Sequence, residues 1–243
     1  IEGGGVRLGI MQPYFFPYLG HFALIANTDQ WVVFDVTQYT PRSWMNRNRV
    51  LHPQKGWVYV NAPLAQSSIS LRTHEARLNN VGAVHQGLLG KLSHYRRKAP
   101  HYDAVIDLVN RTFAYLPDDS LVSLNVSGLA HVCAYLELHF DFRICSELEL
   151  DLHAVQKAGG WAPEICRQLG ASSYLNPVGG RGLFDIADFQ RYGIELAFLE
   201  FSSFSYETGT YGFEPGLSIL DVMMWNTPQR IRQALLDSSR ILS

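Results

Sequence analysis

The sequence predicts an α/β fold, Rossmann-like in outline: a mostly parallel central sheet flanked by helices, with a helical C-terminal portion. Two observations predict it. Short apolar segments rich in β-branched and aromatic residues alternate with segments of helical periodicity along the chain. In addition, the apolar segments 6–10 and 30–36 enclose a helical segment within about thirty residues, which is the length of a βαβ unit whose strands are parallel and adjacent.

The segment 9–25 organises the rest of the chain. It begins as an apolar strand and is interrupted by Pro13 and Pro17, which lack an amide donor and fix φ at about −65°. A helix is expected to open near His21, with its apolar positions facing a core. Ligands bind in open α/β sheets at such a junction, because the strand ends there and the helix amino terminus offers free N–H groups.

The remaining elements follow from the same patterns. Strands are expected over 30–36, 57–63, 140–145, 173–177 and 194–201. Helices are expected over 84–116 with an interruption at Pro100, and over 120–136, 154–169, 188–192, 217–225 and 228–236. The segment 37–49 is polar and predicts irregular structure.

Composition narrows the class of protein. Hydrophobic residues make up 47% and charged residues 17% of the chain, which favours a sizeable core. The formal net charge of −2 gives no basic field for nucleic acid. No apolar run is long enough for a membrane span and no signal peptide is visible, so a cytoplasmic protein is expected. Residues 1–5 resemble the remnant of a cleaved tag, and 6–243 are expected to form one domain.

Three side chains near the first two strand ends are the candidate catalytic residues. His21 is a candidate general base, or a phosphate donor, and its structural alternative is a histidine that packs on Tyr14. Gln12 follows the first strand, where its amide could hold a carbonyl or a phosphate. Asp35 follows the second strand, where it could orient His21 or bind an ammonium group, and its structural alternative is a cap for the next turn.

A polar and aromatic segment after the second strand supplies most candidate binding residues. Arginine guanidinium groups present forked donors that suit phosphate or carboxylate, and neighbouring aromatic rings add apolar surface. A solvated basic turn would look similar. Asn176, which precedes a glycine-rich loop, is a further candidate. The candidate substrate-binding residues are Tyr14, Gln38, Tyr39, Trp44, Asn46, Arg47, Asn48, Arg49 and Asn176. The histidines and the three cysteines show no metal-ligand spacing, so no metal site is predicted.

Four blocks of sequence, in this order along the chain, resemble the WbqC-like protein family. They are MQPYFFPYLG over 11–20, WMNRNR over 44–49, YLNPVGG over 174–180 and FEPGLSILD over 213–221. The resemblance implies a bacterial protein of the gene clusters for O-antigen and other surface polysaccharides. It also implies that acylation or aminoacylation of an amino sugar is a plausible activity.

We therefore expect a transferase that forms an amide by moving an acyl or aminoacyl group from a thioester to an amino sugar or similar amine, in polysaccharide or specialised-metabolite biosynthesis. In this hypothesis His21 deprotonates the amine, Gln12 and Asn46 donate to the oxyanion, and Arg47 and Arg49 bind phosphate. The donor is phosphopantetheine on an acyl or peptidyl carrier protein, or CoA, and no other cofactor is needed. Whether the chain is a monomer or a homodimer stays open.

Two alternatives remain. The Gln-Pro loop and the Gly-His helix start are similar to the nucleotidylyltransferase pattern, which implies nucleotidyl transfer or ATP-dependent ligation with Mg²⁺. The other alternative is a protein that binds a sugar nucleotide or a carrier protein without catalysis.

Overall fold

The central sheet of this computed structural model is mostly parallel, as predicted. The structure describes residues 4–66 and 70–243, and within them six strands form one sheet in the order β5-β2-β1-β6-β7-β8. The strands are β1 (Arg7–Met11), β2 (Gln30–Val33), β5 (Phe142–Ile144), β6 (Ser173–Pro177), β7 (Glu195–Phe201) and β8 (Ser239–Leu242). All neighbours pair in parallel except β7 and β8. The expected tag remnant at 1–5 lies partly outside the described residues.

The strand order places a topological switch point beside β1. From β1 the chain crosses to β2 and then to β5 on one side, whereas β6 and β7 lie on the other side. Adjacent crossovers therefore leave in opposite directions from β1 and β6, which opens a crevice above the carboxyl ends of these two strands. The predicted βαβ unit is confirmed, since β1 and β2 pair in parallel around the helix between them.

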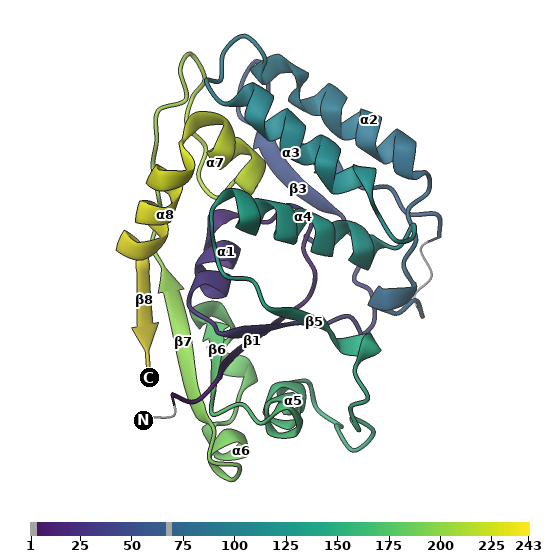
Figure 1. Cartoon of the computed structure of the whole chain (residues 1–243), viewed down its shortest axis with the longest axis vertical. Coiled ribbons are helices and arrows are strands. Elements are labelled where there is room, and N and C mark those ends of the chain that lie inside the picture. The colour runs from purple at the N-terminus through teal and green to yellow at the C-terminus, as the bar shows by residue number, and fades with distance from the viewer. Residues whose placement is uncertain (1–3, 67–69) are drawn as a thin grey trace.

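Helices cover both faces of the sheet (Figure 1). They are α1 (Leu19–Ala26), α2 (Val81–Leu92), α3 (Tyr102–Ala114), α4 (Leu121–Tyr135), α5 (Trp161–Leu169), α6 (Ile186–Gln190), α7 (Ile219–Trp225) and α8 (Pro228–Asp237). One core joins α5 and α6 to the face that carries Leu8 and Ile10. The larger core joins α1, α7, α8 and the layer of α2, α3 and α4 to the opposite face.

Gly9 in β1 allows Trp31 of β2 to pack on the sheet. A Cβ at Gly9 would lie 2.6 Å from Cε3 of that indole. We expect Gly9→Ala to lower the free energy of unfolding by about 1–3 kcal/mol, because the buried ring would have to shift. Urea unfolding measures the change. Gly87→Ala in α2 is the matched control, since a Cβ there meets nothing within 4 Å, and equal losses in both variants would contradict this reading.

The loop between β1 and α1 is held by hydrogen bonds from three distant segments. The Asn48 side-chain amide donates to the Phe15 carbonyl oxygen at 3.1 Å, and the Asn125 amide donates to that of Pro13 at 3.0 Å. The Ser218 hydroxyl donates to the Phe16 carbonyl oxygen at 2.6 Å. These bonds hold Phe16 at a positive φ of 38°, which few side chains adopt without such support.

The prediction of irregular structure over 37–49 was wrong at its end, where β3 (Arg47–Leu51) forms an antiparallel hairpin with β4 (Trp57–Asn61). Buried and partly exposed positions alternate at the start of β3, but the first buried side chain is the polar Asn48, which hydrogen-bonds to the Phe15 carbonyl oxygen. The strand therefore lacks the apolar pattern that predicts one. The strand predicted over 57–63 is confirmed as β4, but it belongs to this hairpin and not to the main sheet.

Two further elements differ from the sequence prediction. The helix expected over 154–169 begins only at Trp161, because Gly159 and Gly160 disfavour helix and Pro163 belongs in a first helical turn. The antiparallel edge strand β8 was not expected at all, since its four residues carry little apolar pattern.

Candidate functional site

A cavity of about 370 Å³ occupies the switch point at the carboxyl ends of β1, β2 and β6. We call it the switch-point cavity. Five aromatic rings supply much of its wall, and two amide side chains give it polar groups. Its lining residues are Ile10, Met11, Gln12, Tyr14, Phe34, Thr37, Ala158, Trp161, Ala162, Tyr174, Asn176, Leu183 and Phe184. The place is the one expected from the strand ends, and it contains the predicted residues Gln12, Tyr14 and Asn176.

The two amides of this cavity are differently held. The Gln12 side chain has no hydrogen-bond partner among the described residues, so its amide is available to a ligand. The Asn176 amide donates to the Tyr174 hydroxyl at 2.7 Å, and burial raises the pKa of that hydroxyl. Asn176 also lies close to Gly180, where a Cβ would come within 2.2 Å of its carbonyl oxygen. Asn176 is therefore fixed in place, whereas Gln12 is not.

A second cavity of about 290 Å³ surrounds the Arg49 guanidinium, and we call it the arginine cavity. Its lining residues are Tyr14, Pro17, Tyr18, Trp44, Asn48, Arg49 and Gly216. The guanidinium carbon lies 5.4 Å from the ring centroid of Trp44 and 5.0 Å from that of Trp57. One guanidinium nitrogen donates to the Gly216 carbonyl oxygen at 3.2 Å, and the Nε has no partner among the described residues.

Arg47 repeats this arrangement two residues earlier on β3. Its guanidinium carbon lies 4.4 Å from the ring centroid of Tyr59, and its buried Nε has no partner among the described residues. Neither Arg47 nor Arg49 forms an ion pair with a carboxylate of the described residues. Two guanidinium charges with aromatic support and no carboxylate partner among the described residues are an arrangement that proteins use to bind phosphate or carboxylate groups.

A third cavity of about 240 Å³ lies at the carboxyl end of β7, and we call it the aromatic cavity. Its lining residues are Tyr18, Leu19, Phe201, Ser202, Ser203, Phe204, Tyr206, Phe213, Pro215, Gly216, Leu217 and Val222. Tyr18 and Gly216 also line the arginine cavity, and Tyr14 lines both the arginine and switch-point cavities. The three cavities therefore follow one another along the loop that the sequence singled out.

His21 lies beneath this loop and lines none of the three cavities. Its side chain is 3% exposed and packs against the rings of Tyr14, Phe22 and Trp31, with centroid distances of 5.3, 6.2 and 5.2 Å. Burial lowers the pKa of His21 to about 3, so the imidazole is neutral at pH 7. Its Nε2 has no partner among the described residues. These surroundings correspond to the structural alternative, a histidine packed on Tyr14.

Asp35 does not orient His21, because the side-chain partner of its carboxylate among the described residues is Ser146. Both oxygens accept from Ser146: one from the amide at 2.9 Å, the other from the hydroxyl at 2.5 Å. The Asp35 backbone carbonyl accepts from the His74 amide at 3.0 Å. The side chain is fully buried and ties the end of β2 to the turn that follows β5.

The other predicted binding residues divide between the cavities and the framework. Trp44 lines the arginine cavity, whereas Asn48 lines it and also holds the loop. Asn46 donates to the Ala62 carbonyl oxygen at 3.3 Å and lines none of the cavities described above. Tyr39 is buried near Arg47, which partly offsets the rise in its pKa caused by burial. Gln38 is exposed and forms an isolated bridge with Arg72.

The sequence analysis did not identify the cavity-lining residues that come from elements outside the first strand and its loop. Phe34 and Thr37 follow β2, so the strand-end rule could have found them. Trp161 begins α5, and its ring packs against Phe34 with centroids 5.6 Å apart. Phe201, Phe204 and Tyr206 belong to no motif that the sequence singled out.

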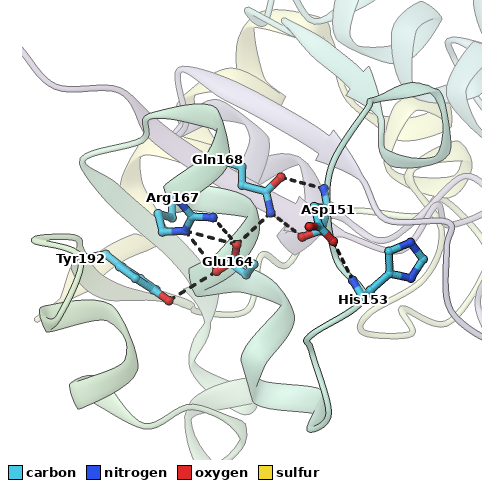
Figure 2. Close-up of polar contacts among 6 residues, drawn as sticks. All are labelled: Asp151, His153, Glu164, Arg167, Gln168 and Tyr192. Carbon is cyan, nitrogen blue, oxygen red and sulfur yellow. Dashed lines mark hydrogen bonds and ion pairs between the residues drawn. The ribbon is translucent and has the colours of Figure 1, made fainter.

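A polar network on the outer side of α5 fixes the helix that carries Trp161 (Figure 2). Glu164 accepts from Arg167, from Gln168 at 2.8 Å and from the Tyr192 hydroxyl at 3.4 Å. Gln168 in turn bonds the backbone of Asp151 through both its oxygen and its nitrogen. The Arg167 hydrogen bonds lower the pKa of Glu164 to about 2. The network ties α5 to the preceding segment and to the turn after α6.

Several other kinds of site find no support among the residues that the structure describes. No group of three or more His, Cys, Asp or Glu side chains gathers there as a metal site would. The three cysteines are buried, and burial raises the pKa of each thiol to about 12. No helix in these ranges has the length and apolar character needed to cross a bilayer.

Comparison with known proteins matches nearly the whole chain. Residues 12–233 match the sequence model of the WbqC-like protein family. The relative named "Uncharacterized protein Rv1507c", from Mycobacterium tuberculosis, is 25% identical over 224 residues, which cover 89% of this chain and 92% of that protein. No solved structure matches the chain significantly.

Proposed function

This chain belongs to the WbqC-like protein family, and from that membership and its adjoining cavities we propose that it is an amide-forming transferase. It moves an acyl or aminoacyl group from a thioester, on a carrier protein or on CoA, to an amino sugar or a similar amine. We further place it in cytoplasmic biosynthesis of surface polysaccharide or a specialised metabolite. The observation that supports this most is the Arg49 guanidinium, which packs on two indoles, has no carboxylate partner among the described residues, and lies next to a cavity that presents two amides.

The two arginines favour a substrate that carries phosphate groups. Amino-sugar substrates and thioester donors of such pathways carry phosphate groups, and a forked guanidinium with free N–H groups binds phosphate through charge-assisted hydrogen bonds. The indoles of Trp44 and Trp57 pack against the Arg49 guanidinium and restrict its motion, so little conformational entropy is lost when the anion binds. Arg47 adds a second charge on the same face of β3.

The amides of the switch-point cavity suit the chemical step. The amine nitrogen attacks the thioester carbonyl carbon, a C–N bond forms, and negative charge develops on the carbonyl oxygen. Gln12 and Asn176 would donate N–H groups to that oxygen. The nitrogen of this intermediate loses a second proton to water, the C–S bond breaks as the carbonyl re-forms, and the leaving thiolate takes up a proton from water.

The proton of the attacking ammonium is not assigned to His21 in this proposal. A base whose conjugate acid has a pKa of about 3 accepts a proton poorly from an amine, and the imidazole is sealed from the cavity. The ammonium instead loses its proton to water before attack. His21 is a positioning residue, whose ring supports that of Tyr14 in the wall shared by two cavities.

The Arg49 site makes a direct prediction for anion binding. We expect Arg49→Ala to weaken binding of inorganic diphosphate about 10- to 100-fold, the value of a hydrogen-bonded charge pair. Isothermal titration calorimetry at fixed low salt measures it. Arg143→Ala removes the same charge from an exposed strand position and should leave the affinity unchanged. Equal losses in both variants would mean that diphosphate senses only net charge.

The reaction itself is tested by mass spectrometry. Acyl and aminoacyl thioesters of CoA and of a phosphopantetheinylated carrier protein are incubated with amino sugars and their nucleotides. Formation of an amide without added metal is the expected result. Release of diphosphate from ATP or CTP with Mg²⁺, and no amide, would instead support the nucleotidyl-transfer alternative, and binding without any product would support a non-catalytic binder.

A further inference from the structure

The aromatic cavity has no role in the amide-forming step described above. Its walls are chemically distinct from those of the other two cavities, because none of the described residues that line it is charged. The rings of Phe204 and Tyr206 lie 5.4 Å apart, and those of Tyr206 and Phe213 lie 5.1 Å apart at nearly a right angle. Such a box of rings suits a flat, neutral ring system.

The polar end of Tyr206 is turned away from this cavity. Its hydroxyl donates to the buried Asp221 carboxylate at 2.6 Å, so the cavity meets the ring and not the phenol oxygen. Ser202 and Ser203 are the hydroxyl-bearing residues of the wall, apart from the tyrosines. The cavity therefore offers stacking surface and a few hydrogen-bonding groups, the combination that binds a nucleobase without strong preference for one base.

The order of the cavities matches the order of parts in a sugar nucleotide. Tyr18 and Gly216 connect the aromatic cavity to the arginine cavity, and Tyr14 connects the arginine cavity to the switch-point cavity. Gly20 leaves room for the Tyr18 ring, since a Cβ there would lie 2.4 Å from its atoms. The uncharged aromatic cavity, the arginine cavity and the amide-bearing switch-point cavity thus form one series along a single loop.

We propose that the substrate amine is a nucleoside-diphosphate-linked amino sugar, with its base in the aromatic cavity, its diphosphate on Arg49 in the arginine cavity, and its sugar in the switch-point cavity. This inference rests on the proposed function and names its acceptor. CoA also carries a base and a diphosphate. The amino sugar is favoured because its sugar is bonded directly to the diphosphate, as adjoining cavities require. In CoA a long pantetheine arm separates the diphosphate from the reacting thioester.

Binding of UDP and dTDP, compared with inorganic diphosphate, tests the base subsite. Stacking of one base contributes about 1–3 kcal/mol, so we expect UDP or dTDP to bind about 5- to 150-fold more tightly than diphosphate. Ser203→Trp, which places a large side chain at an exposed wall position, should abolish this increment and leave diphosphate affinity unchanged. Ser205→Trp is the matched control: Ser205 is also exposed but does not line the cavity, so both affinities should be kept.

Each other result has a definite meaning. Equal affinities for UDP, dTDP and diphosphate, or equal effects of the two tryptophan variants, would overturn the base subsite while the proposed transfer could still be seen as amide formation. If Ser203→Trp weakens CoA but neither UDP nor dTDP, the nucleotide of the donor occupies these cavities and the acceptor assignment is wrong. Failure of amide formation with every thioester would instead overturn the proposed function.

Discussion

Asp221→Ala is expected to lower the free energy of unfolding by about 3–5 kcal/mol, the cost of removing one partner from a buried, charged network. The Asp221 carboxylate is 1% exposed and accepts from three side chains. The Tyr95 and Tyr206 hydroxyls each donate at 2.6 Å, and the indole nitrogen of Trp225 donates at 3.2 Å. Alanine would leave the buried Tyr95 and Tyr206 hydroxyls and the half-buried Trp225 indole nitrogen without this acceptor. Urea unfolding of both proteins measures the difference.

Tyrosine variants separate the network from the loss of one side chain. Tyr206→Phe removes a single donor and should cost about 1–2 kcal/mol, less than Asp221→Ala. Tyr115→Phe is the matched control, because Tyr115 is 92% exposed and should show no measurable loss. A loss for Asp221→Ala no greater than that for Tyr115→Phe would mean that the tyrosines find other acceptors.

His21 is expected to make the folded chain less stable as the pH falls below neutral. Burial lowers its folded-state pKa to about 3, from an ordinary value near 6.5, so between these values the unfolded chain binds a proton that the folded chain does not. Stability is therefore complete above pH 6.5 and falls as the pH decreases. From pH 7.5 to pH 5 the loss due to this one group is about 2 kcal/mol.

The variant His21→Phe isolates that contribution. Other groups titrate in the same range, so the comparison is between the pH dependence of the variant and that of the parent chain, by urea unfolding at pH 7.5 and pH 5. We expect the variant to lose about 2 kcal/mol less over this interval. His153→Gln, at an exposed histidine, is the matched control variant. Parallel pH dependence in the His21→Phe variant and the parent would show that the imidazole is protonated in the folded state.

The fold was predictable wherever apolar residues alone determine an element. Leu8, Ile10 and Trp31 lie in strands that are buried on both faces, so β1 and β2 read as continuous apolar runs. The strand β3 was not predictable in this way. Asn48 takes a buried position there because it bonds the loop carbonyl of Phe15, a contact between residues 33 positions apart that local patterns do not contain.

The candidate site was predictable to the same extent. Gln12 and Tyr14 follow β1, and Asn176 is the penultimate residue of β6, so sheet geometry alone brings them together. The exposure of a side chain depends on what packs over it, and nothing near His21 in sequence shows that Trp31 covers its ring. Asp35 illustrates the same point, because its partner Ser146 is 111 positions away. Trp161 and Tyr206 enter the cavities from elements whose placement only the tertiary structure provides.

The backbone that separates β1 from α1 has a consequence for recognition. Its carbonyl groups are already bonded to Asn48, Asn125 and Ser218, and its prolines restrict the remaining torsions. A ligand therefore meets preorganised walls and does not have to close a lid, so little of its binding free energy is spent on ordering protein. Selectivity among ligands then depends on their shape before binding, and a rigid substrate with its parts correctly spaced gains most.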